Sequence, residues 1–198
     1  MGNRQQIKKV NYPSMKIIGP KEYEITGLKN TDFASQKEAI LALKEEDIDE
    51  EGIQCLCSLI SQSINLQYLI LDMKQNKITV QFIKRIAFAM SKCKTLSTLQ
   101  VKIKDKVEIQ SEDVYNLFDY LSSCKNIKQL IAYIENHNIQ DQNVLNICET
   151  LAKFINLSSL TFLCCNNIHK QDQEIKIINK LKKIKRLVRL KIIFYGVC

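Results

Sequence analysis

Apolar residues recur along this chain with a period of about 30 residues. Successive copies of one pattern begin 30, 31, 30 and 30 residues apart, at Leu66, Leu96, Ile127, Leu157 and Leu187. A second apolar column follows three residues later at the same spacing, at Leu69, Leu99, Leu130, Leu160 and Leu190. Self-similarity at a fixed period of this length is typical of a solenoid, in which every repeat is one supersecondary unit.

Each copy predicts one strand followed by one helix. The segment Leu69-x-Leu71-x-Met73 alternates apolar positions with other residues, which is the period of a strand. Later in the copy the apolar spacing changes to that of one helix face. The predicted faces include Ile53/Leu56/Leu59/Ile60, Ile83/Ile86/Ala87/Met90, Val114/Leu117/Phe118/Leu121, Val144/Ile147/Cys148/Leu151 and Ile178/Leu181/Ile184. No single repeat can bury such a stripe alone, so the repeats must stack on one another.

The domain organisation follows from where the pattern begins. Ala39-x-Leu41-x-Leu43 is the first predicted strand, so residues 36–198 hold about five and a half repeats, with six parallel strands and five helices. Residues 1–35 do not fit the repeat. Two short extended segments there flank a turn at Gly19-Pro20. We interpret residues 1–35 as an N-terminal cap of the solenoid or as a partly ordered tail.

The repeat resembles the leucine-rich repeat of the ribonuclease-inhibitor-like type. Each copy has an L-x-x-L-x-L-x-apolar strand, a short loop with Asn and Ile, and an amphipathic helix. Asn76, Asn138 and Asn167 stand where that family keeps its turn asparagine, whereas the third copy has Lys106 and no asparagine there. The resemblance implies an α/β leucine-rich-repeat solenoid, or horseshoe, with a parallel concave sheet and helices on the convex side. It also implies an extended concave surface for protein partners.

Composition places the protein among ordinary globular domains. Of its 198 residues, 45% are hydrophobic and 25% are charged. No apolar run approaches the roughly 18 residues that a transmembrane helix needs, and no secretory pattern opens the chain. We therefore expect an intracellular, cytoplasmic protein. The opening Met-Gly-Asn leaves N-myristoylation of Gly2 as an alternative, although Gln6 stands where that motif requires Ser or Thr.

The eight cysteines and the missing motifs argue against catalysis. Cys93 and Cys124 occupy a repeat position that Ser63, Phe154 and Ile184 fill in other copies, so we expect them to be buried free thiols. The spacing of the cysteines lacks the C-x(2–4)-C pairs of zinc sites. The sequence contains no phosphate-binding loop and no protease, hydrolase or kinase signature. We predict no metal, no cofactor and no enzymatic activity.

The strand residues between the inward-pointing ones are the candidate binding surface, because side chains alternate faces along a strand. Among them Ile70, Ile131, Leu163 and Ile193 have no expected role in the core and would form an apolar strip in solvent. The alternative is that strand propensity alone placed them there. The full predicted protein-binding face comprises Ile70, Asp72, Lys74, Lys102, Lys104, Ile131, Tyr133, Glu135, Leu163, Ile193 and Tyr195.

The net charge of +8 is concentrated at the C-terminal end. Residues 169–198 hold nine Lys or Arg and two acids, which accounts for +7. The densest stretch predicts a basic patch of Lys180, Lys182, Lys183, Lys185, Arg186, Arg189 and Lys191. It could meet an acidic protein partner, the phosphates of RNA or DNA, or, as a basic amphipathic helix, a membrane or a calmodulin-like partner. The remaining alternative is a solvated face that aids solubility.

The sixth strand, from Leu187 onward, leaves a parallel-sheet edge with unpaired N–H and C=O groups. We expect residues 187–198 to be covered by a partner chain or a second copy, unless the N-terminal segment or the last residues fold back over them. The functional expectation is a non-catalytic protein–protein interaction scaffold, a subunit of a larger assembly, that binds through the concave face and the basic C-terminal end. The alternative is a subunit associated with RNA or DNA through a basic C-terminal helix.

Overall fold

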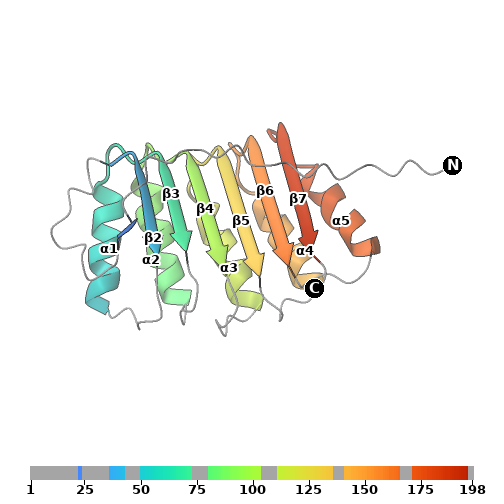
Figure 1. Cartoon of the computed structure of the whole chain (residues 1–198), viewed down its shortest axis with the longest axis horizontal. Coiled ribbons are helices and arrows are strands. Elements are labelled where there is room, and N and C mark those ends of the chain that lie inside the picture. Colours follow the sequence, from blue (N-terminus) through green and yellow to red (C-terminus); the bar gives the residue numbers. More distant parts are fainter. Residues whose placement is uncertain are drawn as a thin grey trace.

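One parallel sheet runs through the whole chain, and one helix follows each of its strands β2 to β6 (Figure 1). The computed structural model describes residues 22–23, 36–42, 50–72, 80–103, 111–135, 141–165 and 171–195. The strands are β1 (Glu22–Tyr23), β2 (Glu38–Ala42), β3 (Tyr68–Asp72), β4 (Thr98–Ile103), β5 (Gln129–Glu135), β6 (Ser159–Cys165) and β7 (Arg189–Tyr195). The helices are α1 (Glu50–Gln62), α2 (Val80–Lys92), α3 (Ser111–Leu121), α4 (Asp141–Leu151) and α5 (Gln171–Leu181).

The six strands β2 to β7 are the predicted repeat strands, and their pairing confirms the predicted register. Successive members of the second apolar column are paired across neighbouring strands, Ala39 with Leu69, then Leu69 with Leu99 and so on to Leu190. Every pair of neighbouring strands is parallel. Equivalent residues of successive repeats therefore lie side by side, and each column of the sequence becomes a row across the sheet.

Strand β1 was not part of the predicted repeat. Its two residues pair in parallel with β2, Glu22 opposite Ile40 and Tyr23 opposite Leu41, so the sheet has a seventh strand at its N-terminal edge. Tyr23 belongs to one of the two short extended segments that the sequence predicted. The other residues of the proposed cap or tail, including Gly2, lie outside the described part of the chain.

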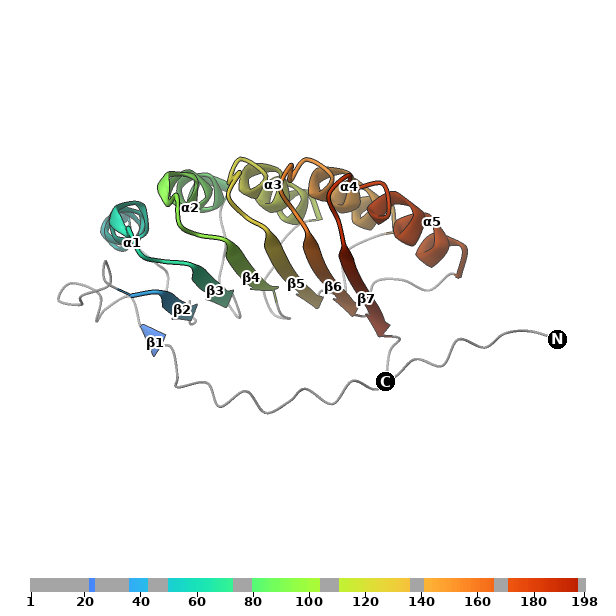
Figure 2. The same ribbon diagram turned by 90° about the horizontal axis from the view of Figure 1, so that it is seen from above.

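The solenoid curves with its sheet on the inside (Figure 2). Neighbouring strands lie about 4.8 Å apart, whereas packed helices need about 8–10 Å between their axes. Because every repeat contributes one strand and one helix, the helical layer must span a longer arc than the sheet. The predicted horseshoe, with a concave parallel sheet and convex helices, is confirmed. Among the described helices, none has the length and apolarity needed to cross a membrane.

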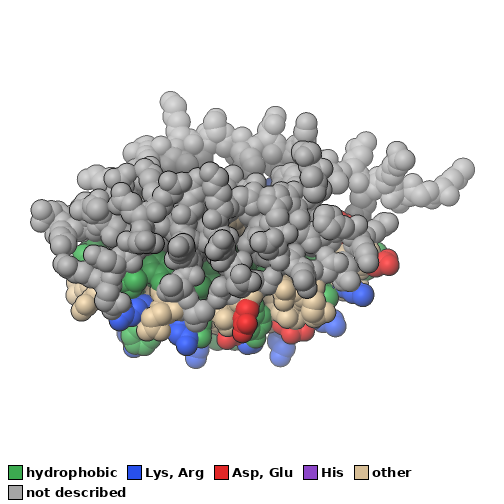
Figure 3. All heavy atoms as spheres, turned by 90° about the horizontal axis from the view of Figure 1, so that it is seen from below, with side chains coloured by type: hydrophobic (Ala, Val, Ile, Leu, Met, Phe, Trp, Pro, Cys, Tyr) green, Lys and Arg blue, Asp and Glu red, His purple; other side chains and the backbone are tan. Residues whose placement is uncertain are grey.

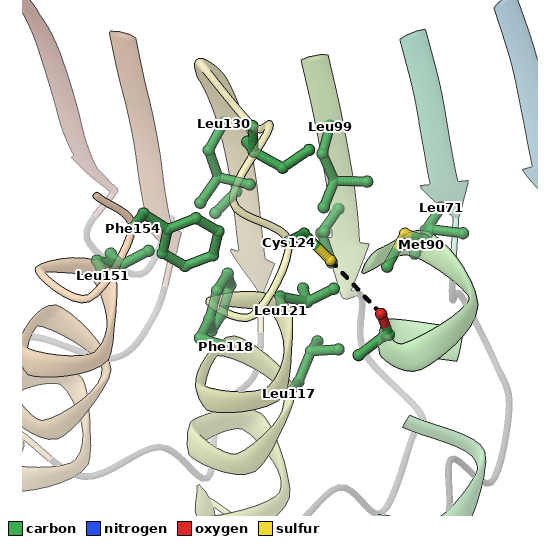
Figure 4. Close-up of a cluster of buried hydrophobic side chains, with 14 of the residues drawn as sticks. Leu71, Met90, Leu99, Leu117, Phe118, Leu121, Cys124, Leu130, Leu151 and Phe154 are labelled. Atoms are coloured by element: carbon green, nitrogen blue, oxygen red, sulfur yellow. Dashed lines mark hydrogen bonds between the residues drawn. The ribbon is translucent and has the colours of Figure 1, made fainter. Parts of the chain in front are cut away.

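The core fills the space between the sheet and the helices (Figure 4). Leu99, Leu130 and Leu160 are at most 1% exposed, as the repeat predicts. In the close-up, Phe118 of α3 and Phe154 of the next repeat fill the space between α3 and α4. The predicted burial of Cys93 and Cys124 is also confirmed, and the Cys124 thiol donates to the Ala87 carbonyl at 3.5 Å. The five cysteines whose side chains the structure describes are free thiols.

Candidate binding surfaces

The concave face of the sheet carries rows of side chains that the strand register places side by side. Figure 1 looks onto this face, with the helices behind it. One row consists of Ile40, Ile70, Gln100, Ile131, Thr161 and Lys191, and the next of Asp72, Lys102, Tyr133, Leu163 and Ile193. The second of these rows is therefore apolar toward its C-terminal end, with Tyr133, Leu163 and Ile193 adjacent across β5, β6 and β7.

Two members of the predicted apolar strip are not exposed to solvent. Ile70 is 8% exposed and Leu163 only 5%, whereas Ile131 and Ile193 are half-buried. The expectation that all four face water was wrong for Ile70 and Leu163. In the register of the sheet, Ile70 lies between Ile40 and Gln100, and Leu163 lies between Tyr133 and Ile193. The accessible area of the strip is therefore that of the half-buried Ile131 and Ile193.

Strands β3 and β4 also carry polar side chains on the concave face, and these bond to one another. Tyr68 donates its hydroxyl to the Gln100 side-chain oxygen at 2.8 Å. Lys102 forms an ion pair with Asp72 at 3.4 Å, so these two predicted binding residues hold each other. Burial, and then the negative charge of Glu38, raises the pKa of the Tyr68 hydroxyl. Tyr68 was missing from the prediction, although it lies two positions before Ile70 and the same alternation identifies it as a concave residue.

Four predicted residues of the concave face have no described side chain. Lys74 and Lys104 lie outside the described residues. Glu135 and Tyr195 are the last residues of β5 and β7, and the register places them at the same end of the face. Their side chains are likewise outside the described part of the structure.

The basic stretch is not a helix. Helix α5 ends at Leu181, and Lys182, Lys183, Lys185 and Arg186 lie in the turns that lead to β7. The amide of Ile184 bonds to the Leu181 carbonyl at 3.2 Å, which closes the first of these turns. Leu181 and Ile184 are both buried, at 0% and 5% exposure, so the core extends from the end of the helix into this turn. The expectation of a basic C-terminal helix was therefore wrong.

The seven predicted basic residues divide between two surfaces. Arg189 and Lys191 lie on the concave side of β7, in register with Ser159 and Thr161. The other five lie at the end of α5 and in the following turns. Two of these five have partners in the preceding repeat, because Lys180 forms an ion pair with Glu149 and Arg186 donates to the Asn156 side-chain oxygen at 2.5 Å. Lys182, Lys183 and Lys185 are exposed.

The outer edge of β7 presents the backbone carbonyl that, at each junction inside the sheet, accepts hydrogen bonds from the next repeat. At each repeat junction two successive amides bond to one carbonyl, as Val188 and Arg189 do to Ser158 at 2.8 and 3.0 Å. The Ser158 and Ser159 amides bond to the Lys128 carbonyl in the same way, at 2.8 and 3.0 Å. One repeat further on, the corresponding acceptor is the carbonyl of Val188, at the edge of the sheet.

A groove of about 370 Å³ lies beside this edge and is lined in part by Leu187, Leu190 and Ile192. These three side chains are half-buried. Their equivalents one repeat earlier are at most 1% exposed, namely Leu157, Leu160 and Phe162. The groove is thus the face that one repeat turns toward the next.

Within the described ranges, no group of three or more His, Cys, Asp or Glu side chains is arranged to hold a metal ion. Burial raises the pKa of the Cys124 thiol to about 12, a smaller effect of the Ser123 hydrogen bond acting the other way. A thiol with this pKa stays protonated near neutrality and is a poor nucleophile.

Comparison with known proteins yields solved structures of the same fold. The actin-binding site 2 of leiomodin-1 matches with a TM-score of 0.52 and 15% identity, over 81% of this chain and 86% of that one. The tropomodulin C-terminal domain of Caenorhabditis elegans matches with a TM-score of 0.50 and 12% identity, over 81% and 90% of the two chains. No protein-family model and no curated protein matches the sequence.

The two likenesses support a leucine-rich-repeat-like α/β fold with a parallel sheet. At 15% and 12% identity they concern the fold alone, because folds of one kind host many functions. A function for this chain must be argued from its own surfaces.

Proposed function

We propose that this chain is a non-catalytic protein-binding module of the ribonuclease-inhibitor-like leucine-rich-repeat type and works as a subunit of a larger assembly. The observation that carries the proposal is the apolar row of Tyr133, Leu163 and Ile193 on the concave face. The core does not need this row, because the core lies on the other side of the sheet. The free thiols of the described cysteines suit the reducing interior of a cell.

The charge beside this row indicates what kind of partner fits. Arg189 and Lys191 lie on the same face of β7 as Ile193. A partner segment with apolar side chains for the row and carboxylates for these two cations would complement both features. Complementary charge mainly raises the association rate and selects the partner, whereas the buried apolar contacts supply most of the affinity.

Actin is the first protein to test, because the matching leiomodin-1 structure is that of actin-binding site 2. The assay is co-sedimentation with filamentous actin and fluorescence binding to monomeric actin. In parallel, chemical crosslinking in the native cell, followed by mass spectrometry, identifies partners independently of this analogy. Each partner found is then purified and its affinity for the chain measured directly.

The decisive variant is the double replacement Ile131→Ser with Ile193→Ser on the concave face. Its matched control is Ile155→Ser with Ile175→Ser, which removes one exposed isoleucine from the turn after α4 and one from α5. We expect the concave variant to weaken partner binding at least about tenfold and the control to leave it unchanged. Equal binding by the concave variant and the parent would show that the partner does not use this face.

We also propose that the basic C-terminal end takes part in binding and that the edge of β7 is covered by a strand of a partner or of a second copy. The groove along Leu187, Leu190 and Ile192 and the position of the Val188 carbonyl support this. Strand addition to an exposed edge is a common mode of peptide recognition. Heparin retention that falls steeply with salt, together with retarded RNA or DNA, would instead favour nucleic acid, for which the comparisons offer no support.

A further inference from the structure

Helix α2 carries a large apolar side chain on the convex surface, where the repeat has no structural use for one. Phe88 is 63% exposed. The equivalent positions of the other four helices are all polar, and they are Ser58, Asp119, Glu149 and Asn179. The solenoid therefore forms without an apolar residue at this position, and Phe88 is an exception that packing does not explain.

A groove lies on each side of Phe88. The one toward α1 has a volume of about 400 Å³ and is lined in part by Cys57, Arg85 and Ala89. The one toward α3 has a volume of about 470 Å³, and Tyr120 forms part of its wall. Ala89 stands where the neighbouring helices have Leu59 and Tyr120, so the surface of α2 is lower beside Phe88. Two hollows with an aromatic ridge between them can receive side chains of another molecule.

The charge around Phe88 is positive. Helix α2 contributes Lys84, Arg85 and Lys92 and contains no acidic residue. The Lys92 ammonium lies 4.8 Å from the centre of the Phe88 ring, and the Lys84 ammonium 5.3 Å from that of Tyr120. The nearby acid, Asp119 of α3, is held in an ion pair by Lys153.

The view from below shows basic and hydrophobic side chains adjoining one another toward the α1–α2 end of the helical rim, and both basic and acidic side chains further along it (Figure 3). The two lysines near Phe88 and Tyr120 lie over aromatic rings, which favours cations there and leaves their remaining N–H donors for carboxylates.

We propose that Phe88 and its two flanking grooves are a docking site for an acidic peptide segment of a partner protein. An apolar side chain of that segment packs against Phe88 in a groove, and its carboxylates face Lys84 and Lys92. The site lies on the helical surface, opposite the concave sheet, so it is independent of the function proposed above. The two surfaces allow the chain to bind two partners at once.

A membrane surface is the competing occupant, since exposed aromatic and basic residues also occur at membrane interfaces. Interfacial binding buries a continuous apolar face, whereas here one Phe stands between two hollows. Hollows of this size suit side chains of a peptide better than the flat surface of a bilayer. The peptide is therefore the occupant that the geometry favours.

The test is selection of displayed random 12-residue peptides on the full chain, with removal of those that also bind Phe88→Ser. Serine is the residue at the equivalent position of α1, so this variant should keep the melting temperature of the parent. We expect the selected peptides to combine net negative charge with at least one large apolar residue. Synthetic versions should bind the parent at least about tenfold more tightly than Phe88→Ser. The matched control Ile155→Ser, which loses an exposed apolar residue elsewhere, should bind like the parent.

A second variant, Lys84→Gln with Lys92→Gln, separates charge from apolar contact and serves if Phe88→Ser is unstable. It should slow association and reduce the dependence of binding on salt. The proposal is overturned if no selected peptide depends on Phe88, or if the Phe88-dependent peptides are neutral or basic. It is also overturned if the parent binds vesicles of phosphatidylcholine and phosphatidylserine, Phe88→Ser does not, and no peptide competes.

Discussion

Leu130→Ala tests whether the stacked columns hold the solenoid together. Leu130 is 0% exposed and pairs in register with Leu99 on one side and Leu160 on the other, both also buried. The substitution removes three carbon atoms from a site without access to water. At about 0.8 kcal/mol per buried methylene, the transfer free energy lost is about 2.4 kcal/mol. A cavity that its buried neighbours cannot fill adds to this, so we expect a total of about 3–4 kcal/mol.

The matched control is Leu190→Ala. Leu190 occupies the same repeat position in β7, but it is only half-buried because no further described strand packs beyond it. The same three carbon atoms are removed, so the chemistry is identical and only the burial differs. We expect this variant to lose roughly 1–2 kcal/mol.

Urea unfolding followed by far-ultraviolet circular dichroism measures both variants against the parent. The comparison requires equal m values, because a changed m indicates a different unfolding transition or an altered denatured state. A small domain has about 5–15 kcal/mol of stability in total, so a loss of 3–4 kcal/mol is easily resolved. Equal losses for Leu130→Ala and Leu190→Ala would refute the idea that stacking between repeats determines the cost. Rapid hydrogen exchange of amides 127–134 in the parent would refute the register itself.

The remaining predictions concern the thiols, the basic end and the sheet edge. Iodoacetamide at pH 8 should leave Cys124 unlabelled in the folded chain, because burial raises its pKa to about 12, and labelling as fast as that of half-buried Cys55 would contradict this. Between the ordinary thiol pKa of 9.0 and about 12, the folded chain keeps a proton that the unfolded chain loses, so the free energy of unfolding should fall as pH rises through this range. Replacing Lys182, Lys183, Lys185 and Arg186 by Gln should keep the melting temperature within a few degrees, as measured by scanning calorimetry. The same variant should bind an acidic partner more weakly, as measured by calorimetric titration. Unchanged partner binding at low and high salt would mean that the four side chains are only solvated. Ile192→Lys should relieve any dimer formed at the β7 edge, as measured by light scattering, whereas strong exchange protection of β7 amides in a monomer would exclude a covering chain.

Much of this fold could be predicted from the sequence because each structural position recurs in several repeats with the same type of residue. The column that contains Leu99, Leu130 and Leu160 has one environment, so its burial follows from the period alone. Strand β1 carries no such signal, since two residues outside the repeat form it. The end of α5 was misjudged because Lys182 and Lys183 continue a basic pattern beyond Leu181, where the helix ends and a turn begins.

The candidate surfaces were harder to predict, because exposure on a curved sheet depends on neighbours that are distant in sequence. Leu163 is only 5% exposed although it lies on the concave face, between Tyr133 and Ile193, which are 30 residues away on either side. The alternation of residues along β6 predicts which face the Leu163 side chain is on, but not how deeply it is buried. Phe88 is hard to find for a different reason. It is exposed and stands outside the apolar columns of the helices, so only an alignment of the polar convex positions reveals it.

In a repeat protein, each residue can be compared with the residues at the equivalent position of the other repeats, and this comparison gives a physical criterion for function. A residue that recurs in a column is explained by the packing that all repeats share, as the buried column of Leu130 is. A residue that departs from its column costs stability or solubility unless something else uses it. Phe88 departs in this sense, because Ser58 and Asp119 show that a polar side chain serves the fold at that position. Phe88→Ser, which restores the residue that α1 has in this column, should therefore change binding while leaving the free energy of unfolding almost unchanged. Leu130→Ala, in a uniformly buried column, should do the reverse.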